Sequence, residues 1–417
     1  MSKFQEYISK IRGSKDGKIL IANFGYLTLL QIASYLFPLV TMPYLARVIG
    51  AEGFGKIAFA SAIITWFQTV TDWGFNYTAT RDVARNREDA EAVSRIFSTV
   101  LWARCILMIV SFLVLSVLIV CVPVFKENAV IILVTFLLVP GHIMFPDWFF
   151  QAMERMKYIT IFNIIIRTLF LVCVFAFVKA PSDYVLQPLF TSVGYLLCGL
   201  LSMYYITRKW GYKLQLVKVY DIWKMMKQST NIFVNNIMPN FYNSFSVMLL
   251  GMVGGNVATG ILDAGSKFVN LSQQFMNILS RTFFPFLSRH IEKHRFYARI
   301  NILCATAISI LLCGLSPWLI HTFFTPEFEG AVSVLRIMAV SLLFLSLNDV
   351  YGTNYMVLRG YEKQLRNITI ISSLIGFAMA FPCIRQWGYI GAAVTIAATR
   401  GLMGILTILY IRIIERK

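Results

Sequence analysis

Eight ionisable side chains interrupt stretches of the sequence that are otherwise apolar, and their chemistry needs an explanation first. Four of them are basic and four are acidic: Arg104, Arg167, Lys267 and Arg400, and Asp72, Asp147, Asp263 and Asp349. A charged side chain costs about 2.5–3.5 kcal/mol at the centre of a bilayer. These residues are therefore expected to pair or to line a water-filled cavity, where a buried cation binds phosphate-like anions and a carboxylate binds cations.

These residues fall into two groups according to their position along the apolar stretches. Arg167, Lys267 and Arg400 lie near the middle of their stretches, where a long side chain cannot easily reach the membrane surface. Asp147 and Asp349 lie toward the ends of theirs, so a structural role and a functional role are equally open for them. The three central cations are thus the first candidates for binding an anion.

Asp263 and Lys267 are one helical turn apart and can meet on one face of a helix. Two interpretations remain open for this pair. It is an internal ion bridge that stabilises the fold, or it is a cationic head-group site in which Asp263 holds or gates Lys267. Arg104 and Asp72 complete the set of candidate substrate-binding residues, which is Lys267, Arg167, Arg400, Arg104, Asp263 and Asp72.

The sequence contains no motif for ATP hydrolysis or for metal binding. No G-x-x-x-x-G-K-[ST] motif occurs, so no ATPase activity is expected. The seven cysteines lack metal-ligand spacing, and His290 and His294 do not form an H-E-x-x-H motif. We expect no catalytic residue, no metal and no cofactor, and we leave open a coupling ion, H⁺ or Na⁺. With no long loop to hold a catalytic domain, the chain is not expected to be an enzyme.

The composition indicates which elements must hold these charges. The chain has 417 residues, of which 58% are hydrophobic and 14% are charged, with a mean hydropathy of +0.67. In a soluble domain about a quarter of all residues are charged. The lower charged fraction of this chain therefore predicts a polytopic, all-α membrane protein. Twelve apolar segments are long enough to span a bilayer. They begin near residues 19, 55, 97, 129, 158, 185, 230, 258, 300, 332, 366 and 390.

Most of the 38 Lys and Arg residues fall in alternate loops and at both ends of the chain. Basic residues concentrate on the cytoplasmic side of membrane proteins, so this distribution predicts that both termini are cytoplasmic. The same distribution explains the net charge of +18 without a nucleic-acid partner.

The stretch 23–81 organises the predicted fold. Its first helix contains Pro38 and Pro43, which are expected to kink it. The corner that follows contains Gly50, Gly53 and Gly55, which permit a sharp reversal into a second helix.

The sequence also repeats itself at an offset close to half its length. The first copy of the pattern is Val48-Ile49-Gly50 followed by Gly55, Ala60 and Ser61. The second copy is Val253-Gly254-Gly255 followed by Gly260, Gly265 and Ser266. A second echo links E-R followed by I-T-I at 154–161 to E-K followed by I-T-I at 362–370. We therefore predict two six-helix bundles, 1–207 and 229–417, joined by a basic cytoplasmic linker, 208–228. The repeat is parallel, related by a pseudo-two-fold axis along the membrane normal, and repeats of this kind bind substrate at their interface.

Several motifs resemble one family. The run P-Y-L-A-R-V-I-G-A-E-G-F-G-K-I-A-F-A at 43–60, followed by G-F-N-Y-T-A-T-R-D at 74–82, closely resembles the opening of the O-antigen flippases. These are polysaccharide repeat-unit transporters of the multidrug/oligosaccharidyl-lipid/polysaccharide exporter superfamily. Residues 145–160, 263–289 and 324–328 are similar to further segments of that family, although Ala152 stands where its members often have glycine.

The resemblance implies a V-shaped exporter fold around a central cavity. It implies that the chain moves an undecaprenyl-pyrophosphate-linked oligosaccharide from the cytoplasmic to the periplasmic leaflet of the bacterial inner membrane by alternating access. It also implies as partners membrane lipid and the polymerase and chain-length regulator of the same pathway. Related flippases place a cavity cation where Lys267 lies, which makes Lys267 the leading substrate contact.

Two other functional classes stay open. A multidrug or cation antiporter of the same superfamily shares the fold but favours an acidic cavity, for which Asp72 and Asp263 are candidates. A membrane-embedded polymerase or acyltransferase is the other, although such polymerases usually expose a large outer loop with catalytic Arg or His. The sequence shows no such loop.

Overall fold

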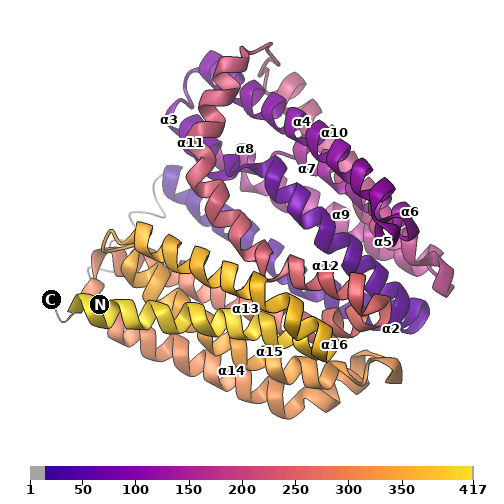
Figure 1. The fold of residues 1–417 in the computed structure, drawn as a ribbon. Coiled ribbons are helices and arrows are strands. Elements are labelled where there is room, and N and C mark those ends of the chain that lie inside the picture. Colours follow the sequence, from indigo (N-terminus) through magenta and orange to yellow (C-terminus); the bar gives the residue numbers. More distant parts are fainter. Residues whose placement is uncertain (1–14, 416–417) are drawn as a thin grey trace.

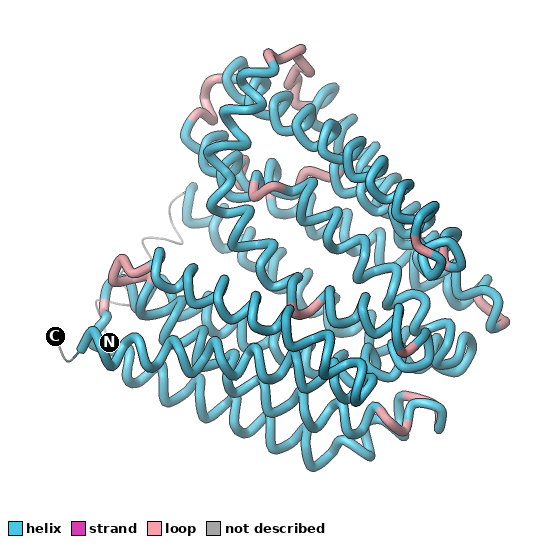
Figure 2. Tube along the Cα trace, viewed as in Figure 1, coloured by secondary structure: helices cyan, strands magenta, loops and turns pink. Residues whose placement is uncertain are grey.

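The computed structural model describes residues 15–415, which are almost entirely helical and contain no strand. Two bundles meet at one end and separate toward the other, so the molecule is V-shaped (Figure 1), and the loops between helices are short (Figure 2). The first half contains α2 (Lys15–Asp72), α3 (Phe75–Arg85), α4 (Ala90–Cys121), α5 (Pro123–Glu127), α6 (Ala129–Phe136), α7 (Leu138–Met144), α8 (Asp147–Ala152), α9 (Met156–Phe177), η1 (Pro181–Val185), α10 (Leu186–Tyr204) and η2 (Tyr205–Lys209). The second half contains α11 (Val219–Ile237), η3 (Met238–Phe241), α12 (Ser244–Val253), α13 (Gly255–Arg289), η4 (Ile291–Lys293), α14 (His294–Phe323), η5 (Pro326–Phe328), α15 (Ala331–Leu347), η6 (Asn348–Met356) and α16 (Glu362–Glu415).

Eight helical segments of the described chain are long and apolar enough to cross a membrane. Two of these segments, which include α2 and α16, are each two helices joined at a corner. Helices α11 and α13 are absent from the eight because their apolar residues are interspersed with polar ones. The chain is a multi-pass membrane protein, and the count of twelve spans stays a prediction.

Both corners depend on a glycine with a left-handed backbone. Gly50 has φ +64° in α2, and Gly388 has φ +54° in α16. Residues with a Cβ rarely adopt this conformation, so glycine allows each helix to fold back. The predicted reversal near Gly50 is confirmed. Pro38 and Pro43 lie inside the first arm of α2, where the backbone remains helical.

Helix α11 packs against the N-terminal bundle. The Trp73 ring stacks on Phe233 with centroids 4.0 Å apart, and the Thr78 and Ser229 hydroxyls lie 2.7 Å apart. Contact with the C-terminal bundle begins within α11, where Arg366 of α16 donates to Asn231 Oδ1 at 3.3 Å, and continues at η3, where Phe241 packs against Phe377 with ring centroids 5.6 Å apart. The predicted linker 208–228 therefore contains the end of η2, an extended segment and the first turns of α11. The division into 1–207, 208–228 and 229–417 stays a prediction.

The two bundles touch most closely where α2 crosses α13. A Cβ added to Gly55 would overlap the carbonyl oxygen of Asn256, and a Cβ added to Gly260 would overlap the carbonyl oxygen of Ala51. The contact is therefore reciprocal. Gly55 and Gly260 are also equivalent positions of the predicted repeat, so the repeat axis passes near this crossing. Only glycine permits two helix backbones to approach so closely.

We predict that Gly260→Ala destabilises the protein by about 1–3 kcal/mol, because the new methyl group must push α2 away from α13. The measurement is thermal unfolding of the purified protein in detergent. Gly314→Ala in α14 is the matched control, since a Cβ there meets open space, and we expect it to be neutral or slightly stabilising. Equal melting temperatures for the two variants would show that the close crossing does not hold the bundles together.

Candidate functional site

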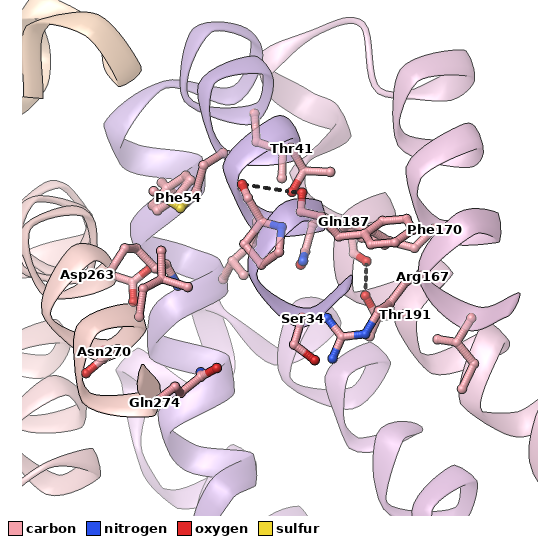
Figure 3. A pocket seen from close by; sticks show the side chains of 18 of the residues that line it. Ser34, Thr41, Phe54, Arg167, Phe170, Gln187, Thr191, Asp263, Asn270 and Gln274 are labelled. Atoms are coloured by element: carbon pink, nitrogen blue, oxygen red, sulfur yellow. Dashed lines mark hydrogen bonds and ion pairs between the residues drawn. The ribbon is translucent and has the colours of Figure 1, made fainter. Parts of the chain in front are cut away.

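A cavity of about 460 Å³ lies between the bundles. Both arms of α2 line it, together with α9 and α10 on one side and α13 on the other (Figure 3). Spacing along each helix explains which side chains reach it. Gln187, Thr191 and Tyr195 recur every four residues on α10, and such residues share one helix face.

Helix α13 presents charged and amide groups to the cavity on the same face that carries the Gly260 crossing. Asp263 and Lys267 lie one and two turns beyond Gly260, and Asn270 and Gln274 continue the face. The close crossing therefore also fixes the rotation of α13, and with it the direction of these four side chains.

Asp263 and Lys267 form an ion pair inside the cavity. Asp263 Oδ2 lies 2.8 Å from Lys267 Nζ, and their side chains are 21% and 36% exposed. The ammonium also lies 5.8 Å from the centre of the Phe54 ring, which favours a cation. The predicted meeting of the two side chains on one face is confirmed. Because both groups still reach solvent in the cavity, the pair can open to admit an anion.

Arg167 faces the same cavity from α9, on the wall opposite α13, with Ser34 and Thr191 nearby (Figure 3). It is half-buried and forms no ion pair with any described residue. The cavity thus holds two cations and one carboxylate, which leaves it positively charged. Pro38 has no backbone N–H and cannot donate to the carbonyl oxygen of Ser34, four residues earlier. This carbonyl oxygen therefore adds a hydrogen-bond acceptor to the cavity.

The cavity is closed at the end that contains the corners. The Glu327 carboxylate in η5 accepts a hydrogen bond from the backbone N–H of Ala51 at 3.0 Å. A carboxylate in this position caps the second arm of α2 and complements its helix dipole. Beside this bond, the Phe54 ring packs edge-on against Phe324 and Phe328, with centroids 5.9 and 5.7 Å apart.

Residues 20–291 match the family described as "Polysaccharide biosynthesis protein". The chain belongs to this family. The match includes α2, the crossing and the cavity-lining parts of α9, α10 and α13. The resemblance seen in the motifs of 43–60 and 74–82 is therefore confirmed.

Two curated relatives agree with this placement. A protein of Escherichia coli (strain K12) named "Putative O-antigen transporter" is 28% identical over 400 residues, covering 94% of this chain and 96% of its own length. A protein of the same name from Shigella dysenteriae is 24% identical over 388 residues, covering 91% of this chain and 97% of its own. Both names describe transporters rather than enzymes.

Solved structures confirm the fold of this polysaccharide biosynthesis family member. One is the inward-facing conformation of a multidrug resistance MATE family transporter of the MOP superfamily, with a TM-score of 0.64 at 12% identity, covering 93% of this chain and 97% of that chain. The outward-facing conformation of such a transporter gives a TM-score of 0.56 at 14% identity, with 97% of each chain covered. The predicted all-α, V-shaped exporter fold is confirmed.

Two other predicted site residues lie together inside the N-terminal bundle of this family member. The Arg104 side chain is 3% exposed and donates to Asp72 Oδ1 at 2.9 Å. It also donates to Asn76 Oδ1 at 2.7 Å. Neither Arg104 nor Asp72 lines the cavity. Because three helices meet at this cluster, it holds α2, α3 and α4 together, and a role in substrate binding stays a prediction for both residues.

Arg400 is buried in the C-terminal bundle, where it connects α16 to its neighbours. It donates to Ser341 Oγ of α15 at 3.1 Å and to Asn243 Oδ1, just before α12, at 3.4 Å. It does not line the cavity, so its assignment to the substrate site also stays a prediction. Asp147 is the first residue of α8 and Asp349 is the second residue of η6, and neither lines the cavity.

The structure therefore brings together Arg167, Asp263 and Lys267 from the predicted set. It adds neutral polar residues that the sequence analysis did not select, namely Ser34, Thr41, Gln187, Thr191, Asn270 and Gln274. Their helical spacing was a usable signal on α10 and α13. Glu327 was also missed, because its partner is 276 residues away in the chain.

We predict that Glu327→Ala lowers the free energy of unfolding by about 1 kcal/mol, the usual cost of losing a helix cap. The measurement is chemical or thermal denaturation of the purified protein. Glu329→Ala is the matched control, because Glu329 is exposed and pairs with His321 within the same bundle. We expect an effect below about 0.5 kcal/mol there. An equal loss in both variants would mean that the bond to Ala51 contributes nothing to closing this end.

Proposed function

We propose that this chain carries an oligosaccharide linked to undecaprenyl pyrophosphate across the bacterial inner membrane, from the cytoplasmic to the periplasmic leaflet. Membership of the polysaccharide biosynthesis family and the O-antigen transporter names of two relatives support a polysaccharide transporter. The positive charge of the cavity supports the more specific proposal that the transported head group is a pyrophosphate.

Two cations on opposite walls of the cavity support this proposal most strongly. Arg167 projects from α9 and Lys267 from α13, with Asp263 as the one carboxylate in the lining. A pyrophosphate has oxygens enough to bind both cations at once, and charge-assisted hydrogen bonds of this kind contribute about 1.5–3 kcal/mol each. The amides of Asn270 and Gln274 are suited to sugar hydroxyl groups.

Transport then requires the cavity to open alternately to each side. This structure is held closed at the Gly50 end by the Glu327 bond and the aromatic contacts of Phe54. The start of α2 and the end of α16 lie at the opposite end, where the bundles separate (Figure 1). We propose that this is the inward-open state, because the bundles separate at the end that holds the start of α2 and the end of α16 (Figure 1). Separation of α2 from α13 at Gly55 would open the other side.

The orientation follows from the basic residues. We propose that both termini are cytoplasmic, which places the closed end at the periplasm. The substrate then enters laterally from the cytoplasmic leaflet, while its polyprenyl chain stays in membrane lipid. The polymerase and chain-length regulator of the same pathway are proposed as partners. Transport is coupled to H⁺, to Na⁺ or to the gradient of the substrate itself.

A cation or multidrug antiporter is the second candidate, because the solved neighbours include multidrug transporters. Such a function requires an available carboxylate in the cavity. Asp263 is the only carboxylate among the lining residues, and its charge is already compensated by Lys267. The additional charge of Arg167 makes the cavity still less favourable for a cation.

We predict that Lys267→Ala and Lys267→Glu lose transport by about 10- to 100-fold, because one charge-assisted contact to the pyrophosphate is removed. Lys267→Arg retains the charge and keeps substantial transport. The measurement is movement of a fluorescent lipid-linked oligosaccharide in proteoliposomes without ATP. Lys56→Ala is the matched control, since Lys56 forms the same type of pair with Glu52, at 2.7 Å, outside the cavity.

A double variant separates substrate binding from a purely structural role. Asp263→Asn/Lys267→Met removes both charges, so neither is left unpaired. If the pair serves only the fold, this variant transports normally, and Lys267 is removed from the substrate site. If Lys267 binds the pyrophosphate, the double variant remains as inactive as Lys267→Ala.

A further inference from the structure

A second cavity, of about 900 Å³, lies in the C-terminal bundle at the end where the bundles separate. Its walls are the first turns of α14 and the last turns of α16, and η6 lies between them. None of its lining residues lines the cavity between the bundles. Nothing in the proposed transport cycle requires it.

Four arginines from three different segments converge on this second cavity. They are Arg295 and Arg299 of α14, Arg359 just after η6, and Arg412 of α16. All four are exposed, and none forms an ion pair with a carboxylate of a described residue. The Arg359 guanidinium lies 4.7 Å from the centre of the Tyr355 ring, which orients it. Like charges gathered from separate helices are unfavourable unless an anion joins them.

Acidic residues do not supply that anion. Glu292 is the single acid in the lining. Its carboxylate lies 3.2 Å from the Nδ1 atom of His290, which is outside the cavity lining. One carboxylate cannot neutralise four guanidinium groups, so the cavity remains strongly basic.

The deeper part of the lining is apolar. Ile302 and Leu303 lie one to two turns beyond the arginines on α14, and Ile408 and Ile411 precede Arg412 on α16. The Leu303 side chain is 68% exposed, which in a membrane helix means that it faces lipid. The cavity thus passes from cationic at the membrane surface to aliphatic toward the hydrocarbon. A soluble anion would use only the first half of this surface.

We propose that this second cavity binds the phosphate head group of an anionic phospholipid, such as phosphatidylglycerol, with its acyl chains along Ile302 and Ile408. Arginines bind phosphate oxygens in pairs, and basic pockets between helices at the cytoplasmic surface accept such head groups. By bridging α14, η6 and α16, the lipid stabilises this end of the C-terminal bundle. The proposal does not depend on which substrate the chain transports.

The experiment uses the full-length protein in detergent, titrated with dioctanoyl phosphatidylglycerol, with dioctanoyl phosphatidylcholine and with inorganic phosphate. Native mass spectrometry gives the Kd, and the shift in Tm reports stabilisation. We expect phosphatidylglycerol to bind at least about tenfold more tightly than phosphatidylcholine. Arg295→Gln/Arg299→Gln should weaken phosphatidylglycerol binding by about 30-fold, from about 1 kcal/mol for each arginine.

Arg208→Gln/Lys209→Gln is the matched control, because these exposed basic residues of η2 lie outside the cavity. Binding should be unchanged in it. Equal affinity for the two phospholipids, or equal losses in the two double variants, would overturn the proposal. Inorganic phosphate raising Tm as much as phosphatidylglycerol would make this a site for soluble anions and overturn the lipid assignment. If the arginine double variant does not fold, Arg412→Gln takes its place, and it should raise the Kd for phosphatidylglycerol by about fivefold. An unchanged Kd in that variant would overturn the proposal.

Discussion

The close crossing of α2 and α13 at Gly55 and Gly260 sets the geometry of both the closed end and the cavity. Each glycine lies against a backbone carbonyl of the other helix, so no side chain separates the two backbones. Because α13 is fixed at this point, its polar face turns toward the cavity and carries Asp263 and Lys267 with it. The contact that closes one end of the molecule therefore also places the charged groups at the site.

The reciprocity of this contact suggests how the molecule can change state. Equivalent positions of the two halves meet there, and the interface around them is formed by small residues and by the rings of Phe54, Phe324 and Phe328. Among the described residues, the Glu327 bond is the one side-chain hydrogen bond between η5 and α2. A largely apolar interface with one capping bond can separate without leaving buried charges unpaired. The charged groups lie deeper, where they remain hydrated in the cavity.

Local patterns made much of this predictable. The Gly50 corner and the Asp263–Lys267 pair follow from spacing within one segment, and they are present in the structure. The depth of a residue along a helix was equally readable. The rotation of each helix was not, because packing against distant segments sets it. Arg400 therefore lies within the second arm of α16 but is buried against Ser341 instead of lining the cavity.

The most direct measurement is photo-crosslinking from inside the cavity. Benzoylphenylalanine at Asn270, which lines the cavity on α13, is irradiated in the presence of radiolabelled lipid-linked oligosaccharide. The same group at Ile310, exposed on α14 outside both cavities, is the control. We expect an adduct at Asn270 that excess unlabelled substrate suppresses, and none at Ile310. Equal labelling at both positions, or none at Asn270 in a variant that still transports, would contradict a substrate path between the bundles.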